Sequence, residues 1–156
     1  MNADRAMDEL LAERLRPGVY QWRTLPDGPC AAGGAGWAGR AEKAGWRAFH
    51  LDGHRVRDKD AFLRLCAEVF AFPEWFGGNW DALEDCLADL SWAPACAGYV
   101  VLYESWAELA EADQASFRTI LDVFADAVEA WRDTPTPMTV LLPSTGAEVA
   151  GVPRLA

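Results

Sequence analysis

Three carboxylates in the middle of the chain have the residue type and spacing that could do chemistry. Asp81, Glu84 and Asp85 stand three and four residues apart, so a helix would place them on one face. Glycoside hydrolysis uses two carboxyl groups with separated pKa values. No Lys or Arg occurs from residue 73 to residue 91, and a wholly acidic face does not separate such a pair. We therefore expect no catalytic residue and favour recognition of a cationic partner, with a carboxylate-based hydrolase as an alternative.

The residues before these carboxylates predict the start of the helix that carries them. Pro73 removes a backbone donor, and Gly77–Gly78 can adopt a positive φ at little cost. Asn79 has a side chain that accepts hydrogen bonds from the first free N–H groups of a helix. Leu83 and Leu87 then stand four residues apart, which predicts a buried face opposite the carboxylates.

Aromatic residues flank the acidic face at Trp75, Phe76 and Trp80. One interpretation is an acidic first turn that suits the helix dipole and faces solvent. The other is a protein-binding surface, in which aromatic anchors supply contact area and carboxylates supply charge. The spacing alone leaves both interpretations open.

The net charge of −10 is concentrated in the centre of the 156-residue chain. Residues 1–72 contain 11 Lys/Arg and 10 Asp/Glu, whereas residues 73–133 contain 2 Arg and 13 Asp/Glu, a net charge of −11. Such a field repels nucleic acid and anionic membranes and attracts basic partners. We therefore expect a basic protein partner and no nucleic-acid or membrane partner.

The other residues with chemical potential predict no cofactor and no metal site. His50 and His54 stand four residues apart, but the turn signal Asp52-Gly53 lies between them, so they would not face one way. The chain has no P-loop motif and no dinucleotide-binding fingerprint after a predicted strand. The four cysteines form no C-x-x-C pair, and the N-terminus has no apolar signal region. We expect reduced cysteines that serve as small packing residues in a cytoplasmic protein.

Hydrophobic periodicity predicts an α/β chain of one domain. Strands are expected at residues 19–22, 46–51, 98–103 and 137–143, and helices at residues 3–15, 59–70, 80–90, 105–110 and 114–131. Asp58 and Asp113 are predicted caps, like Asn79. The first two strands and a helix between them would form a βαβ unit with a right-handed crossover. Residues 98–103 are almost continuously apolar, which is typical of a buried parallel strand.

Residues 73–87 read Pro-Glu-Trp-Phe-Gly-Gly-Asn-Trp-Asp-Ala-Leu-Glu-Asp-Cys-Leu. This run resembles the hallmark of the barstar family of ribonuclease inhibitors, and weaker similarity extends from about Trp46 to Leu142. The resemblance implies a small three-stranded parallel sheet packed with helices, to which residues 19–22 would add an N-terminal edge strand. It also implies a single domain over residues 1–145, with a core at 46–143, an extension at 1–45 and a tail at 146–156.

The resemblance also implies a set of partner-binding residues. They are Trp75, Phe76, Gly77, Asn79, Trp80, Asp81, Glu84 and Asp85. Asp85 stands at the family's phosphate-mimicking aspartate, and Asp81 stands at the other inhibitory aspartate of the helix. Asn79 and Gly77 match loop residues that touch the enzyme, and Trp75 stands at the main contact tyrosine.

Several positions depart from the family's founding member. Phe76 replaces a tyrosine, Glu84 replaces the Trp just before the key aspartate, and Gly78 replaces a Glu. Gln114 and Arg118 replace two acidic contacts at the start of the later long helix. These departures predict a cognate enzyme that differs from the founding one.

The resemblance and the charge together predict an acidic, bacterial, cytoplasmic inhibitor that binds a basic ribonuclease or related toxin as a 1:1 complex and is a monomer when free. The prediction includes no enzymatic activity. Two alternatives remain open at this point: an immunity protein against a toxin that is not a ribonuclease, and an interaction module without inhibitory activity. The role of residues 1–45 also stays open.

Overall fold

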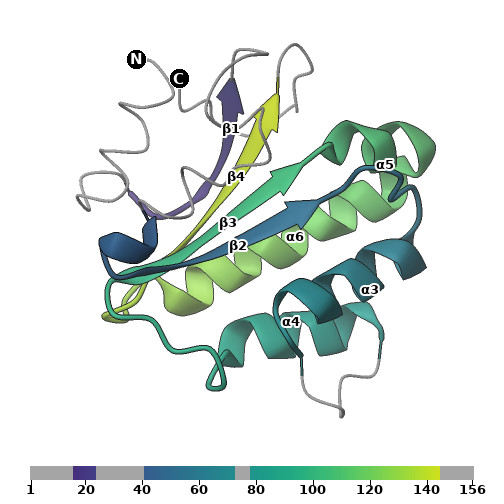
Figure 1. The fold of residues 1–156 in the computed structure, drawn as a ribbon. Helices are drawn as coiled ribbons and strands as arrows, with labels where there is room; N and C mark the ends of the chain where they lie inside the picture. Colours follow the sequence, from purple (N-terminus) through teal and green to yellow (C-terminus); the bar gives the residue numbers. More distant parts are fainter. Residues whose placement is uncertain (1–15, 24–40, 73–77, 145–156) are drawn as a thin grey trace.

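Four parallel strands form the centre of the protein (Figure 1). The computed structural model describes residues 16–23, 41–72 and 78–144. In chain order the strands are β1 (Val19–Arg23), β2 (Trp46–Asp52), β3 (Gly98–Glu104) and β4 (Met138–Ser144), and their order in the sheet is β1-β4-β3-β2. The first six residues of β3 are buried, which explains its continuous apolar run: a central parallel strand is covered on both faces.

In the described part of the chain, helices α3 (Lys59–Val69), α4 (Trp80–Asp89), α5 (Trp106–Ala112) and α6 (Gln114–Trp131) lie between strands β2 and β4 in the sequence. The predicted caps are confirmed. The carboxylate oxygen of Asp58 accepts a hydrogen bond from the Ala61 amide at 2.8 Å, and that of Asp113 accepts one from the Ser116 amide at 3.1 Å.

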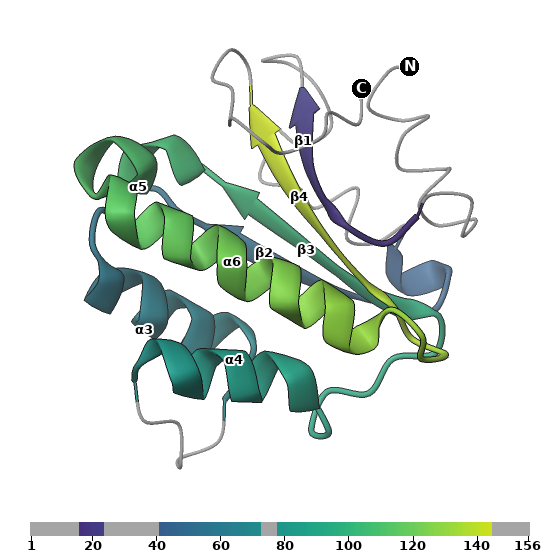
Figure 2. The same ribbon diagram turned by 180° about the vertical axis from the view of Figure 1, so that it is seen from behind.

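Helices α3, α4 and α6 lie on the same face of the sheet and run side by side (Figures 1 and 2). Between them and the sheet lies the main core, in which alternate strand residues meet the inner sides of the helices. The largest fully buried side chains are Tyr103, Phe62, Phe70, Phe124, Leu51, Leu83, Leu87 and Leu90. The helices are therefore fixed relative to one another by a shared core, which positions their outer faces.

The edge strand expected at residues 19–22 is confirmed, since β1 pairs with β4 from Val19↔Val140 to Arg23↔Ser144. It gives the sheet four strands, rather than the three that the core alone was expected to have. Strands β1 and β2 lie parallel in one sheet, as expected, but they are not neighbours, since β4 and β3 lie between them. Local patterns identify strands and leave open which strands pair. The helix expected at residues 3–15 and the tail at 146–156 lie outside the described residues.

Candidate functional site

Helix α4 begins as the sequence predicts, with a glycine and a capping asparagine. Gly78 has a φ of +70°, and a Cβ there would meet nothing within 4 Å, so the glycine serves the backbone conformation rather than a close approach. The Asn79 side chain then accepts a hydrogen bond from the Ala82 amide at 2.8 Å, and its carbonyl accepts one from the Leu83 amide at 3.0 Å. These contacts fix the direction in which the helix leaves the loop.

The two faces of α4 differ in the way its spacing predicts. Leu83, Cys86 and Leu87 are fully buried against the core. Asp81 and Asp85 are exposed, and Glu84 is half-buried. The carboxylates therefore stand on a helix whose position is fixed by the opposite face.

Trp80 is held by α3 as well as by its own helix. Its ring centroid lies 6.4 Å from that of Phe62, and the Lys59 ammonium nitrogen lies 5.6 Å from the Trp80 centroid. A cation over an indole face is attracted to the ring's negative surface. The half-buried indole is thus a rigid anchor at the junction of α3 and α4.

Helix α6 adds carboxylates that the sequence analysis did not include in the site. The Glu84 and Asp126 carboxyl groups lie where they can share a hydrogen bond once one of them is protonated, and this raises the pKa of Glu84 above its ordinary value. Burial raises it further, as does repulsion from Asp126, Asp81 and Asp85. Asp122 lies one turn before Asp126 and is also exposed. We call Asp81, Glu84, Asp85, Asp122 and Asp126 the acidic ridge.

Two contacts between α4 and α6 show that the helices run in the same direction (Figure 2). Besides the Glu84–Asp126 pair, the Leu87 carbonyl accepts a hydrogen bond from the Trp131 indole at 2.7 Å, one turn further along both helices. Four residues before the Glu84–Asp126 pair are Trp80 and Asp122, so the start of α4 lies beside the middle of α6. Gln114 and Arg118 are exposed nearer the N-terminus of α6.

The described residues include only part of the predicted site. Asn79, Trp80, Asp81, Glu84 and Asp85 are brought together at the start of α4. The predicted contacts Trp75, Phe76 and Gly77 lie outside the described residues.

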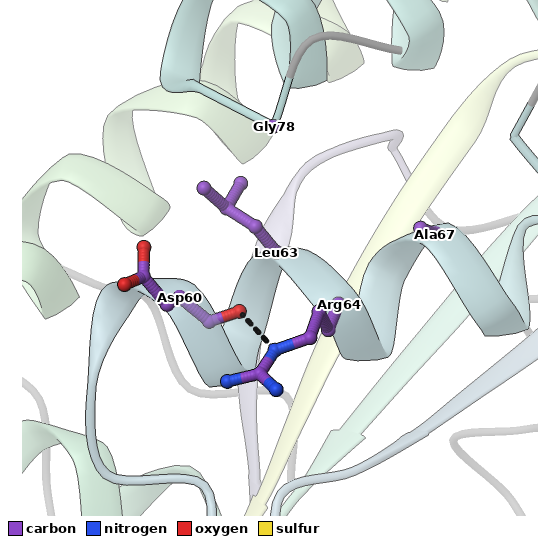
Figure 3. Close-up of a pocket in the computed structure, with 5 residues that line it drawn as sticks. All are labelled: Asp60, Leu63, Arg64, Ala67 and Gly78. Carbon is purple, nitrogen blue, oxygen red and sulfur yellow. Dashed lines mark hydrogen bonds between the residues drawn. The ribbon is translucent and has the colours of Figure 1, made fainter. Parts of the chain in front are cut away.

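A hollow of about 470 Å³ lies beside this region, between α3 and Gly78 (Figure 3). Its walls include the apolar side chains of Leu63 and Ala67 together with Asp60 and Arg64. The Arg64 Nε donates to the Asp60 carbonyl at 3.4 Å. None of the ridge carboxylates is among the described wall residues.

The histidines lie away from the ridge and contact separate carboxylates. His50 Nε2 lies 2.7 Å from Glu104 Oε1, off the axis for a hydrogen bond, and His54 Nδ1 lies 3.1 Å from Glu108 Oε2. Arg57 also reaches Glu108, at 3.4 Å. Within the described ranges, no cluster of three His, Cys, Asp or Glu residues could hold a metal ion.

The cysteines follow the prediction only in part. Cys66 and Cys86 are buried free thiols, and burial raises the pKa of Cys66 well above its ordinary value and that of Cys86 to about 11. Cys96 is exposed, so the prediction that the cysteines are buried packing residues was wrong for it. Cys30 lies outside the described residues.

No helix in the described part of the chain is long and apolar enough to cross a membrane.

Comparison with solved structures finds an α/β fold in a much longer protein. The structure of the Aeropyrum pernix ORC2 protein, in ADPNP–ADP complexes, is similar with a TM-score of 0.62 and 15% sequence identity. The similarity covers 90% of this chain and 40% of that one, so this chain spans less than half of the longer protein's length. At this identity the likeness concerns the fold alone.

Comparison with sequences gives a narrower result. No curated protein matches the chain. The family model described as "Barstar (barnase inhibitor)" matches residues 46–143, which include helices α3 to α6 and strands β2 to β4 but for the final residue of β4. This match spans more than half of the chain, and the chain therefore belongs to the barstar family.

Proposed function

We propose that this protein inhibits a basic ribonuclease by inserting the start of α4 and the loop before it into the enzyme's active site. The observation that carries the proposal is the family match over residues 46–143 together with an exposed acidic ridge at the place of the family's motif. The active site of a ribonuclease is cationic because it binds phosphates. An acidic helix can therefore occupy it and exclude RNA.

Asp85 has the central role in this proposal. It is exposed on α4 and matches the aspartate that stands in the family for a phosphate group. Asp81, one turn earlier, would meet a second cation of the enzyme. A carboxylate that accepts hydrogen bonds from Arg or Lys in a desolvated contact slows dissociation, whereas the surrounding negative field speeds association.

The residues around these aspartates would shape the contact. Trp80 presents a rigid indole beside the carboxylates, and Asn79 and Gly77 match loop positions that touch the enzyme. Trp75 and Phe76 would supply the aromatic contact area that dominates many protein interfaces. The complex is proposed to be 1:1, cytoplasmic and free of cofactors, and the protein itself is proposed not to be an enzyme.

The departures from the family favour a cognate enzyme that differs from barnase. Glu84 adds a carboxylate where the founding member has Trp, and it faces Asp126 of α6. A toxin with another catalytic activity would meet the same ridge if its active site is cationic. An assay of RNA cleavage by the captured enzyme separates these two targets.

The test is capture of a partner from a cytosolic extract of the source organism, at low and at physiological salt. The wild type is expected to retain a small basic nuclease that Asp81→Ala/Asp85→Ala does not retain. Asp89→Ala is the matched control, because Asp89 is an exposed carboxylate near the other end of the same helix. The proposal fails if the wild type retains no basic enzyme at low salt, or if the double variant inhibits the captured enzyme as well as the wild type.

A further inference from the structure

The acidic region of the chain contains one arginine that forms no ion pair or hydrogen bond with the described residues. Residues 73–133 hold 13 acidic residues and only two arginines, Arg118 and Arg132. Arg132 Nη2 lies 3.3 Å from Glu129 Oε2, so its charge is already matched. Arg118 is exposed and has no ion pair or hydrogen bond with any residue that the structure describes, although Asp122 stands only one turn away.

The position of Arg118 is set by the packing of α6 against α4. Asp126 faces Glu84, and Arg118 precedes Asp126 by eight residues, or about 12 Å along the helix axis. Asn79 precedes Glu84 by five residues, or about 7.5 Å. Because the helices run in the same direction, Arg118 lies about 4.5 Å beyond the level of Asn79, one turn past Asp122 at the end of the acidic ridge.

The surface therefore has a negatively charged part and a positively charged end. Carboxylates occupy the first two turns of α4 and the facing turns of α6, and Arg118 lies one turn before them on α6. A uniformly basic enzyme surface would meet repulsion at Arg118 and attraction elsewhere. A surface that has a carboxylate beside its cationic cleft would be attracted at both ends, because the planar fork of Arg binds a carboxylate through two parallel hydrogen bonds.

We propose that Arg118 is a specificity-determining contact, which pairs with an acidic side chain at the edge of the partner's cationic active site. The inference rests on the proposed function and adds to it the charge pattern of the partner: basic in the cleft and acidic where the cleft meets the N-terminal half of α6. An enzyme that is basic throughout this region is selected against by the same residue.

A simpler explanation for Arg118 is a role in the stability of the free protein. An exposed Arg one turn before Asp122 reduces repulsion among the ridge carboxylates in the free protein. In that case the replacement of Arg118 by Glu lowers stability by a small amount. The affinity for a basic enzyme then rises, because the net charge becomes more negative. The two roles therefore differ in the sign of the effect on affinity.

The experiment compares Arg118→Glu with Arg132→Glu against the basic enzyme captured by the wild type. Both variants change the net charge by −2, so each increases the long-range attraction of a basic enzyme equally. We expect Arg118→Glu to weaken binding at least about tenfold, mainly through faster dissociation, whereas Arg132→Glu keeps the wild-type affinity or slightly improves it. Arg118→Gln should lie between Arg118→Glu and the wild type.

Three further readouts keep the outcomes distinct. Circular dichroism checks that Arg118→Glu is folded, which we expect because Glu is a good helix former near a helix N-terminus. A second measurement replaces single Asp or Glu residues around the enzyme's cleft by Arg, and one of these changes should restore binding to Arg118→Glu. Asp85→Ala tests the proposed function in the same assay.

The results separate the inference from the function it rests on. If Arg118→Glu binds as tightly as Arg132→Glu, or more tightly, while Asp85→Ala weakens binding, the inference is wrong and the inhibitor function stands. If Asp85→Ala has no effect on inhibition, or if the wild type retains no basic enzyme, both the proposed function and the inference about Arg118 are wrong.

Discussion

Helices α3 and α4 have similar buried faces, but their exposed faces differ in charge. Each begins after a capping side chain that accepts a hydrogen bond at 2.8 Å from the alanine amide at the third helical position. Each places a fully buried residue at the fourth position, Phe62 in α3 and Leu83 in α4. Both helices therefore have the same kind of N-terminal cap and the same kind of buried face.

The outer faces differ at positions that correspond one to one. The second helical position is Asp in both helices, Asp60 and Asp81. The sixth position is Arg64 in α3 but Asp85 in α4, so the residues four apart carry opposite charges in one helix and like charges in the other. Since a neighbouring helix folds on the same sheet without an acidic face, the fold does not require the carboxylates of α4. The proposed function assigns them to the contact with a basic partner.

The largest expected effect tests the claim that the inner faces are equivalent. We expect Leu83→Ala to lower the free energy of unfolding by about 2–5 kcal/mol and Phe62→Ala by about 3–5 kcal/mol, because both side chains are fully buried and would leave cavities. Equilibrium urea denaturation of the full chain measures both. A loss below about 1 kcal/mol for Leu83→Ala would mean that α4 is not anchored in the core and that its outer face is not held in place.

The sequence predicted the parts of the fold that depend on local signals. Helix α6 has the predicted bounds, 114–131, because Asp113 marks its start and apolar residues repeat at helical spacing from Phe117 to Val128. The cap at Asn79 and the buried face of α4 follow from the same kind of signal. Neither inference requires knowledge of what the helix packs against.

The parts that were missed depend on contacts between distant segments. The pairing of β1 with β4 joins residues that are about 120 positions apart, and nothing in the composition of either strand specifies the other. The contact of Glu84 with Asp126 requires the relative position of two helices, which is set by core packing. Helical spacing on α6 does predict that Asp122 and Asp126 are exposed, and this was the available signal that the acidic surface extends beyond α4.

The raised pKa of Glu84 predicts that the free energy of unfolding depends on pH through α4. Its pKa is raised from an ordinary value of 4.5, first by the hydrogen bond with Asp126, then by burial and by the surrounding carboxylates. A carboxyl group with a raised pKa binds its proton more tightly in the folded state. The stability that it contributes is fully present below pH 4.5, where the unfolded chain is protonated too, and is lost as the pH rises through the folded pKa.

Replacing the carboxyl group should remove this contribution. We expect the free energy of unfolding of Glu84→Gln to fall less than that of the wild type between about pH 4 and pH 7, measured by urea denaturation at each pH. Glu68→Gln is the matched control, because Glu68 is an exposed residue on α3. Equal slopes for the wild type and Glu84→Gln would contradict the shared hydrogen bond between α4 and α6.

The smallest expected effect on stability comes from exchanging the charges at the sixth position of the two helices. Asp85→Arg gives α4 the opposite-charge pair of α3, and we expect it to stabilise the free protein by roughly 0.4–1 kcal/mol, since a repulsive pair becomes attractive. Arg64→Asp makes the reverse change in α3 and should destabilise by a similar amount. Thermal unfolding of the variants at low salt measures both changes, and high salt should reduce them.

Binding should respond to the same two variants in a different way. Asp85→Arg is expected to abolish inhibition of the captured enzyme while the protein becomes more stable, whereas Arg64→Asp should leave inhibition within about threefold of the wild type, as a charge change outside the proposed contact acts mainly through the long-range field. Gain of stability with loss of binding is the signature of a residue kept for recognition at the expense of its own helix. If Asp85→Arg destabilises the protein by more than about 1 kcal/mol, the carboxylate has a structural role after all, and the contrast between α3 and α4 no longer argues for a partner.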